Sequence, residues 1–273
     1  YEEASMNIKE ACETIDTIIN FNTIQEITTQ TYNQQIKIGL SRSSEDSNLL
    51  DSFVNNKDVN NPKFANSNRA IMYIHGLNLT NSFFIGDKRQ TLKYSLLMTE
   101  LYEVKSYLIE YSTIGYVSSL YNLVNAFLDN DQVEDARKTL DKLENVKDKY
   151  GIPTSHNIGA RVFFYSNNIR LGLYLNDDKY TDSKRLIESS HPSLEKFRPY
   201  IGKPQLYEYY FLLAKYFIVS GAFKEALIYT NLILNDSEFK LREDLLSAVK
   251  LMNLLIQYEL NRDFSIDYLT KST

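Results

Sequence analysis

The feature that most constrains this chain is a short pattern of small, aromatic and apolar residues that returns at intervals of 41 to 47 residues. Its clearest copy is Gly221-Ala-Phe-Lys-Glu-Ala-Leu-Ile-Tyr-Thr-Asn-Leu-Ile-Leu234, in which Ala226 follows the turn glycine by five residues. The run before it places Ala214 and Phe217 on one face of an expected helix, because residues three or four apart share a helix face. The segment is therefore predicted to be two helices joined by a tight turn.

The same pattern, with its residues at the same relative positions, can be followed in four further places. We call this set of positions the repeat frame. The residue that corresponds to Ala226 is small or polar in these copies. At this position the five copies have Thr91, Ala136, Ser183, Ala226 and Asp267, with spacings of 45, 47, 43 and 41 residues. Arrays of stacked helix pairs have periods in this range. Only 9 glycines and 5 prolines occur in 273 residues, too few for the turns of a β-rich protein of this length. The sequence therefore predicts an all-α chain of helix pairs.

Over about residues 65 to 273 the pattern resembles the tetratricopeptide repeat (TPR) family. In that family a small residue of the first helix faces an alanine of the second, and the resemblance assigns these roles to Ala214 with Ala226 and to Val124 with Ala136. It also implies the fold, a right-handed superhelical stack of antiparallel helix pairs (a TPR-like α-solenoid). The period exceeds the family's usual 34 residues, so each helix is expected to be a turn or more longer.

The N-terminal part follows a different pattern. Residues 5 to 40 are expected to form one long or two shorter amphipathic helices, in which the run Ile8, Cys12, Ile15 and Ile19 predicts a buried structural thiol at Cys12. Residues 41 to 67 form a polar connection around an apolar island that suits a short docking helix; the island comprises Leu49, Leu50, Phe53 and Val54. We expect residues 1–64 to be an N-terminal helical segment and residues 65–273 to be the repeat domain, continuous with it.

Charge and hydropathy exclude two classes of partner. The net charge of −5 and pI near 5.4 argue against nucleic-acid binding, which needs a concentrated basic field. The sequence contains no apolar span of about 18 residues that would insert into a membrane, and the chain is expected to be cytoplasmic. It begins at Tyr1 and ends at Thr273 within a helix-like run, so we expect it to be a piece of a longer protein.

No motif for chemistry stands out. His75, His156 and His191 lack the spacing that presents two metal ligands on one helix face. His75 is expected to be a satisfied, half-buried side chain, and His191, followed by Pro192, is expected in a turn. Glu208 has no second acid within one helical turn for acid–base work. The sequence predicts a protein that is not an enzyme and has no cofactor and no metal.

Function is then expected on the concave face of the stack, where the resemblance places the partner-binding residues. The predicted groove residues are Tyr121, Asn125, Tyr165, Asn168, Phe211 and Lys215, with Ser118, Asn176 and Glu208 beside them. Tyrosine supplies contact area and asparagine both donates and accepts hydrogen bonds, which suits an extended peptide. The alternative is that these tyrosines pack against the neighbouring helix pair. The family's clamp for chaperone tails is not expected, because Tyr121 and Glu208 stand where basic residues would be needed.

Three functions remain open from the sequence. The leading hypothesis is a non-enzymatic scaffold that binds a protein or peptide segment. The second is a peptide-sensing regulatory domain of a larger protein, which a helix-turn-helix upstream of Tyr1 would favour. The third is an α/α-toroid enzyme, which would need several acids converging on one cleft, whereas the repeat frame puts only Glu208 on the groove face.

Overall fold

The computed structural model describes residues 2–38, 40–55, 64–151, 156–236 and 243–260. Throughout these residues the regular secondary structure is helical, with no β-strand, which confirms the all-α prediction. The chain divides into two compact units, Tyr1–Lys142 and Leu143–Thr273, which are described separately. The expected division at residue 64 stays a prediction, although helices from both sides of it contact each other in the first unit.

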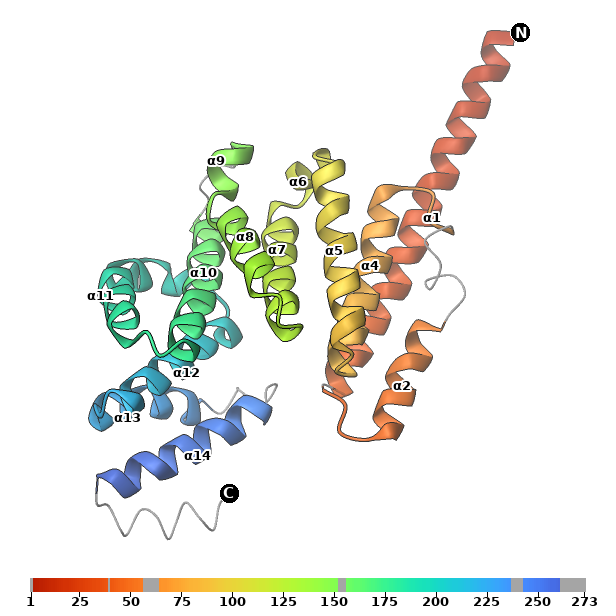
Figure 1. The fold of residues 1–273 in the computed structure, drawn as a ribbon. Coiled ribbons are helices and arrows are strands. Elements are labelled where there is room, and N and C mark those ends of the chain that lie inside the picture. Colours follow the sequence, from red (N-terminus) through yellow and green to blue (C-terminus); the bar gives the residue numbers. More distant parts are fainter. Residues whose placement is uncertain (1, 39, 56–63, 152–155, 237–242, 261–273) are drawn as a thin grey trace. The chain divides into compact units, whose positions relative to one another are not determined.

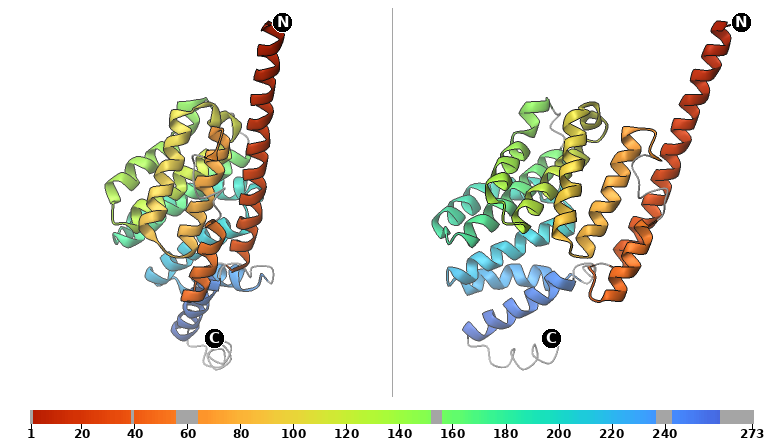
Figure 2. Two further views of the ribbon diagram at one scale, coloured as in Figure 1. Left: turned by 90° about the vertical axis from the view of Figure 1, so that its right-hand side faces the viewer. Right: turned by 45° about the vertical axis from the view of Figure 1, so that its right-hand side comes forward.

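The first unit runs from a long N-terminal helix to most of α8 (Figure 1). Its helices are α1 (Glu2–Ile38), α2 (Ser44–Val54), α4 (Asn68–Phe84), α5 (Lys88–Val104), α6 (Tyr107–Tyr111), α7 (Thr113–Asp129) and α8 (Val133–Glu144). Helix α4 contacts α1, α2 and α5, and α5 contacts α7. Figure 2 shows the N-terminal half of α1 extending beyond α4, so only the second half of α1 lies against it.

The contacts of α1 and α2 test the N-terminal predictions. Leu50 and Val54 of α2 are buried, and Val54 packs against Leu77 of α4, which confirms the short docking helix. Ile24 of α1 packs with Ala70 and Ile74 of α4. The prediction of a buried thiol is wrong, because Cys12 is exposed. The apolar residues around Cys12 lie in the half of α1 that extends beyond α4, where they are exposed.

The second unit begins with the end of α8 and contains three long helix pairs or parts of them. Its further elements are α9 (Val146–Tyr150), α10 (His156–Asn176), α11 (Tyr180–Phe197), the 3-10 turn η2 (Arg198–Tyr200), α12 (Lys203–Val219), α13 (Phe223–Leu234) and α14 (Glu243–Glu259). Its core is built around α10 and α12, where Phe164, Tyr209 and Leu213 are almost fully buried. The Phe164 and Tyr209 rings meet edge to face, with centroids 5.9 Å apart, a favourable arrangement for two aromatic quadrupoles.

One turn geometry recurs four times in the described residues. Each turn contains a residue with a left-handed backbone: Gly86 (φ 76°), Asp131 (φ 59°), Asp178 (φ 57°) and Gly221 (φ 73°). The N–H of the next residue then donates to the carbonyl five residues back, as in Gln132 to Phe127 and Ala222 to Phe217. This is the Schellman helix end, for which glycine has no Cβ penalty and aspartate is a tolerated substitute.

These turns join the predicted helix pairs. They link α4 with α5, α7 with α8, α10 with α11 and α12 with α13. Their left-handed residues are 45, 47 and 43 residues apart, the same spacings that the sequence frame predicts. After Gly86, Asp87 also begins the next helix, because its Oδ1 accepts from the N–H of Gln90 at 2.9 Å.

The burial of the small and apolar positions follows the frame in three copies. Ala136, Ser183 and Ala226 are each 0% exposed, as are their expected counterparts Val124, Leu171 and Ala214. In the first copy Leu79 is buried and Thr91 half-buried. The last copy does not fit, since its Leu255 and Tyr258 are exposed, and its Asp267 lies outside the described residues.

Two proline predictions have different outcomes. Pro204 lies in the first turn of α12, as expected for a residue without an N–H. The prediction of a turn at His191 is wrong, because Pro192 lies inside α11 and His191 is an exposed helical residue. Only the Glu188 carbonyl loses its helical donor there, and the helix continues to Phe197.

Candidate functional site

One face of α10 carries the most informative group of predicted residues. Arg161, Tyr165, Asn168, Gly172 and Asn176 follow one another at intervals of four, three, four and four residues, so they lie along one side of the helix. Two of them, Tyr165 and Asn168, are predicted groove residues. We call these five residues, with Phe211 and Lys215 of α12, the α10–α12 face.

A hydrogen bond joins the two helices of this face. Lys215 Nζ donates to Asn176 Oδ1 at 3.4 Å, across a separation of 39 residues in sequence. The frame assigned Asn176 and Lys215 to corresponding faces of successive helix pairs, and the structure brings them together within the second unit. The α10 and α12 helices contact each other, so the two predicted faces are neighbours.

Asn168 is buried and unsatisfied. Its residue is 6% exposed, and neither its amide nitrogen nor its amide oxygen has a hydrogen-bond partner among the described residues. A buried polar atom without a partner costs roughly 1–3 kcal/mol, so this side chain is an energetic defect in the free chain. The predicted groove residue Asn168 is therefore not exposed to solvent.

Tyr165 is also buried, with 4% exposure. Its hydroxyl accepts a hydrogen bond from Arg161 Nη1 at 3.0 Å. Tyr165 therefore packs within the fold instead of standing in solvent, which agrees with the alternative weighed for the tyrosines. Phe211 is half-buried and packs against the core of the second unit.

Open space lies beside Asn168 on the same face. A Cβ atom added to Gly172 would meet no atom within 4 Å, although Gly172 is in the middle of a long helix. Glycine in a helix interior costs about 0.5–1 kcal/mol relative to alanine, and one use of it is the close approach of another backbone. Gly172 lies between Asn168 and Asn176 along the helix.

The face also carries unneutralised positive charge. Neither Arg161 nor Lys215 forms an ion pair with any residue of the described chain. Each instead contacts a neutral side chain, Arg161 the Tyr165 hydroxyl and Lys215 the Asn176 amide. The face can therefore bind carboxylate or carbonyl groups, to which Arg161 and Lys215 would donate hydrogen bonds.

Tyr121 and Asn125 belong to the first unit, on α7. Both are half-buried, and Asn125 Nδ2 donates to the Tyr121 carbonyl at 3.0 Å. This bond within the helix already uses one donor of Asn125. The six predicted groove residues thus form two groups, two residues in the first unit and four in the second.

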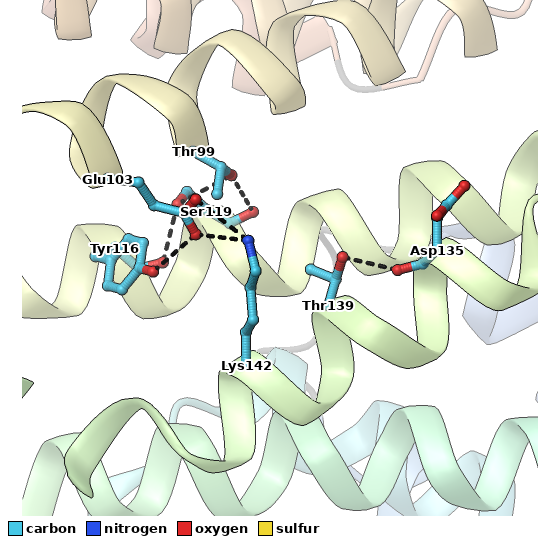
Figure 3. Close-up of polar contacts among 7 residues, drawn as sticks. All are labelled: Thr99, Glu103, Tyr116, Ser119, Asp135, Thr139 and Lys142. Carbon is cyan, nitrogen blue, oxygen red and sulfur yellow. Dashed lines mark hydrogen bonds and ion pairs between the residues drawn. The ribbon is translucent and has the colours of Figure 1, made fainter. Parts of the chain in front are cut away.

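A polar cluster in the first unit was not predicted from the sequence (Figure 3). Glu103 of α5 accepts from Tyr116 Oη of α7 at 3.2 Å and from Lys142 Nζ of α8 at 2.9 Å. Thr99 and Ser119 approach each other beside it, with hydroxyl oxygens 3.5 Å apart. Glu103 and Lys142 are 39 residues apart, so no local pattern could reveal the pair. Because Glu103 bonds to both partners, the cluster ties three helices together and offers no free acid.

The described residues hold no group of three His, Cys, Asp or Glu side chains that could share a metal ion. His75 is 8% exposed, and its Nδ1 atom lacks a hydrogen-bond partner within the described chain, so the expectation that it is satisfied is wrong. Burial, and then the charge of Lys93, lower the pKa of His75. No helix in the described part of the chain is both long and apolar enough to span a membrane.

Comparisons with known proteins leave the site to be interpreted from its own geometry. No protein-family model matches the chain, and neither the curated proteins nor the solved structures contain a significant match to it.

Proposed function

We propose that this chain is a non-enzymatic helical repeat scaffold, similar to tetratricopeptide domains, that binds an extended protein or peptide segment on the α10–α12 face. In this proposal the helix pairs stack as a right-handed superhelix. The single observation that carries it is Asn168, whose buried amide has both a donor and an acceptor without partners.

An extended peptide supplies the two groups that Asn168 lacks. A backbone peptide unit has one N–H donor and one C=O acceptor, and an asparagine side chain pairs with both. Because the amide atoms of Asn168 are buried, the side chain would have to turn towards the open space at Gly172, where a bound backbone could approach the helix. Binding would then remove the defect that the free chain contains, so part of the affinity comes from satisfying Asn168.

The remaining residues of the site have supporting roles in the proposal. Lys215, which has no acidic partner in the described chain, would pair with a carboxylate or carbonyl of the bound segment. Tyr165 and Phe211 would form the packed support of the face. On the first unit, Tyr121 and Asn125 would contribute a second contact region, since both are half-buried on α7.

The experiment is a selection of random linear peptides on the whole chain, followed by titration calorimetry of the selected peptides. Asn168→Ala should weaken binding by roughly 1–3 kcal/mol, the value of a buried hydrogen-bonding partner. Asn167→Ala is the control, because Asn167 Nδ2 already donates to the Phe163 carbonyl at 2.8 Å and only its Oδ1 lacks a partner in the described chain. Equal affinities for wild type and Asn168→Ala would refute the proposed site.

A further inference from the structure

We infer that the first half of α1 is a self-association surface, through which two copies of this chain pair as a short parallel coiled coil. The surface consists of Ile8, Ala11, Ile15, Ile18 and Asn22, which we call the α1 seam. The intervals are three, four, three and four residues, the heptad spacing that keeps side chains along one side of paired helices. All five residues are exposed.

The seam and the buried face of α1 lie on opposite sides of the helix. The second half of α1 buries Ile24, Thr28, Thr31 and Gln35 against the rest of the first unit, with exposures of 0 to 7%. Ile24 follows Ile15 by nine residues, which is about two and a half turns at 3.6 residues per turn. The body of the unit therefore does not block the seam, and two bodies would stand on the outer sides of a pair.

The exposed apolar area is the first argument for a partner. Ile8, Ile15, Ile18 and Ile19 are 66%, 54%, 53% and 56% exposed, and they are adjacent on a helix that extends beyond α4 (Figure 2). Pairing two copies would bury on the order of 1,000 Å² in total, the lower limit for a specific interface. Each copy would contribute about half of this area, and exposed apolar patches of a few hundred Å² are often functional.

Charge distribution favours a second copy over a charged partner. The positions that flank a heptad seam are occupied by uncharged residues, namely Asn7, Cys12, Thr14 and Ile19. The charged residues Lys9, Glu10, Glu13 and Asp16 occupy the outward-facing positions of the same turns. Two copies can thus approach without like charges meeting, and no charged rim selects a basic or acidic partner.

Asn22 selects the parallel orientation. An asparagine at a seam position is costly unless a second asparagine lies opposite, and this requirement fixes register and orientation in coiled coils. Parallel pairing in register places Asn22 opposite Asn22 of the second copy. Ile8 and Ile15 are branched at Cβ, as two-stranded pairs prefer at these positions. Ile18 at the alternating position would by itself favour more strands, so the polar Asn22 also sets the number of strands.

Sedimentation velocity of the reduced full chain at increasing concentration tests the inference. Wild type should form a dimer with a dissociation constant on the order of micromolar. Ile15→Lys should remain monomeric with unchanged helicity, because Ile15 is exposed in the single chain. Glu13→Lys, on the outward side, is the control and should dimerise as wild type does. A monomeric wild type at all concentrations, or a dimeric Ile15→Lys variant, would overturn the inference.

Cross-linking then tests the orientation. In a Cys12→Ser background, Ile18→Cys should form a disulfide-linked dimer on mild oxidation, whereas Glu13→Cys should not. A dimer in which Ile18→Cys fails to cross-link would overturn the parallel seam.

Discussion

Arg170 of α10 forms a bidentate ion pair with Glu144, the last residue of α8. Its Nε and Nη2 atoms donate to Oε1 and Oε2 of the carboxylate, each at 2.5 Å. The hydrogen bonds to Glu144 raise the pKa of Arg170, and burial of the guanidinium opposes this effect. Because two parallel bonds define both distance and orientation, the pair holds the end of α8 against the helix that carries Asn168 and Gly172.

Loss of this pair should weaken the second unit. Glu144→Gln keeps the shape but removes the charge, and it should lower the free energy of unfolding by about 1 kcal/mol, since the pair is partly exposed. Glu188→Gln is the control, because the Lys184–Glu188 pair is 3.9 Å apart and its side chains are 65% and 66% exposed. Urea unfolding measures both. Equal effects of the two substitutions would contradict the assigned role of Arg170.

Two glycines should respond in opposite directions to alanine. A Cβ on Gly115 would lie 2.7 Å from Ser112 Oγ and still closer to the hydroxyl of buried Tyr102, so Gly115→Ala should destabilise by about 1–3 kcal/mol through overpacking. Gly172→Ala meets open space in a helix interior and should stabilise by about 0.5–1 kcal/mol. Thermal unfolding of both variants measures the two effects. If the unfolding temperature shifted in the same direction for both, the surroundings of one of the two glycines would be misassigned.

Gly172→Ala also bears on function. Because the added methyl group would occupy the space proposed for the bound backbone, the variant should bind selected peptides more weakly while being more stable. Calorimetric titration beside the unfolding measurement separates the two effects. Full affinity in a stabilised Gly172→Ala variant would place the peptide elsewhere.

Asn168→Leu should raise stability and weaken binding together. Leucine has a similar volume and leaves no buried polar atom without a partner, so the free energy of unfolding should rise by roughly 1–3 kcal/mol. The peptide would lose the donor and acceptor that pair with its backbone. If denaturant unfolding shows Asn168→Leu to be less stable than wild type, Asn168 has a partner in solution and is not the proposed peptide contact.

Alkaline pH should destabilise the second unit through Tyr207. Burial, and then the hydrogen bond that its hydroxyl donates to Asp236, raise the pKa of Tyr207 to about 12. A folded pKa above the unfolded value of about 10 means that the stabilisation is complete below pH 10. It is lost as the pH rises towards 12, because the unfolded chain releases the proton first.

Tyr207→Phe provides the test of this linkage. Lys203 lies 2.8 Å from the same Asp236 carboxylate, so the acid keeps a partner in the variant. Urea unfolding between pH 8 and about pH 12 should show a smaller alkaline loss of stability for Tyr207→Phe than for wild type. The other buried tyrosines with a raised pKa, such as Tyr209 and Tyr210, contribute a common background to both proteins. Parallel pH profiles would show that the Tyr207 pKa is not raised by folding.

The helix pairs could be predicted because their signals are local. A left-handed residue at a helix end and a small buried residue five positions later depend on neighbours within one turn, and Ala136 and Ala226 follow that pattern at 0% exposure. The last copy fails at Tyr258, which is exposed. None of the described helices covers Tyr258, and the periodicity of the sequence could not reveal this.

The candidate site was only partly predictable for a related reason. The frame identified Asn168, Asn176 and Lys215 as residues of one kind of face, and the hydrogen bond between the latter two confirms that α10 and α12 place them side by side. The burial of Asn168 depends on how neighbouring helices cover it. That covering involves residues distant in sequence, as does the unpredicted pair of Glu103 and Lys142.

The sequence by itself determined that this protein is helical, where its helix pairs turn, and which residues share each helix face, because the period of 3.6 residues and the turn chemistry are properties of the local chain. Only the tertiary structure decided which face is buried. In α1 the apolar run around Ile15 predicted burial, yet the structure buries Ile24 and Gln35 and exposes Ile15. An apolar helix face is buried only where another helix packs against it, and local sequence does not specify that contact.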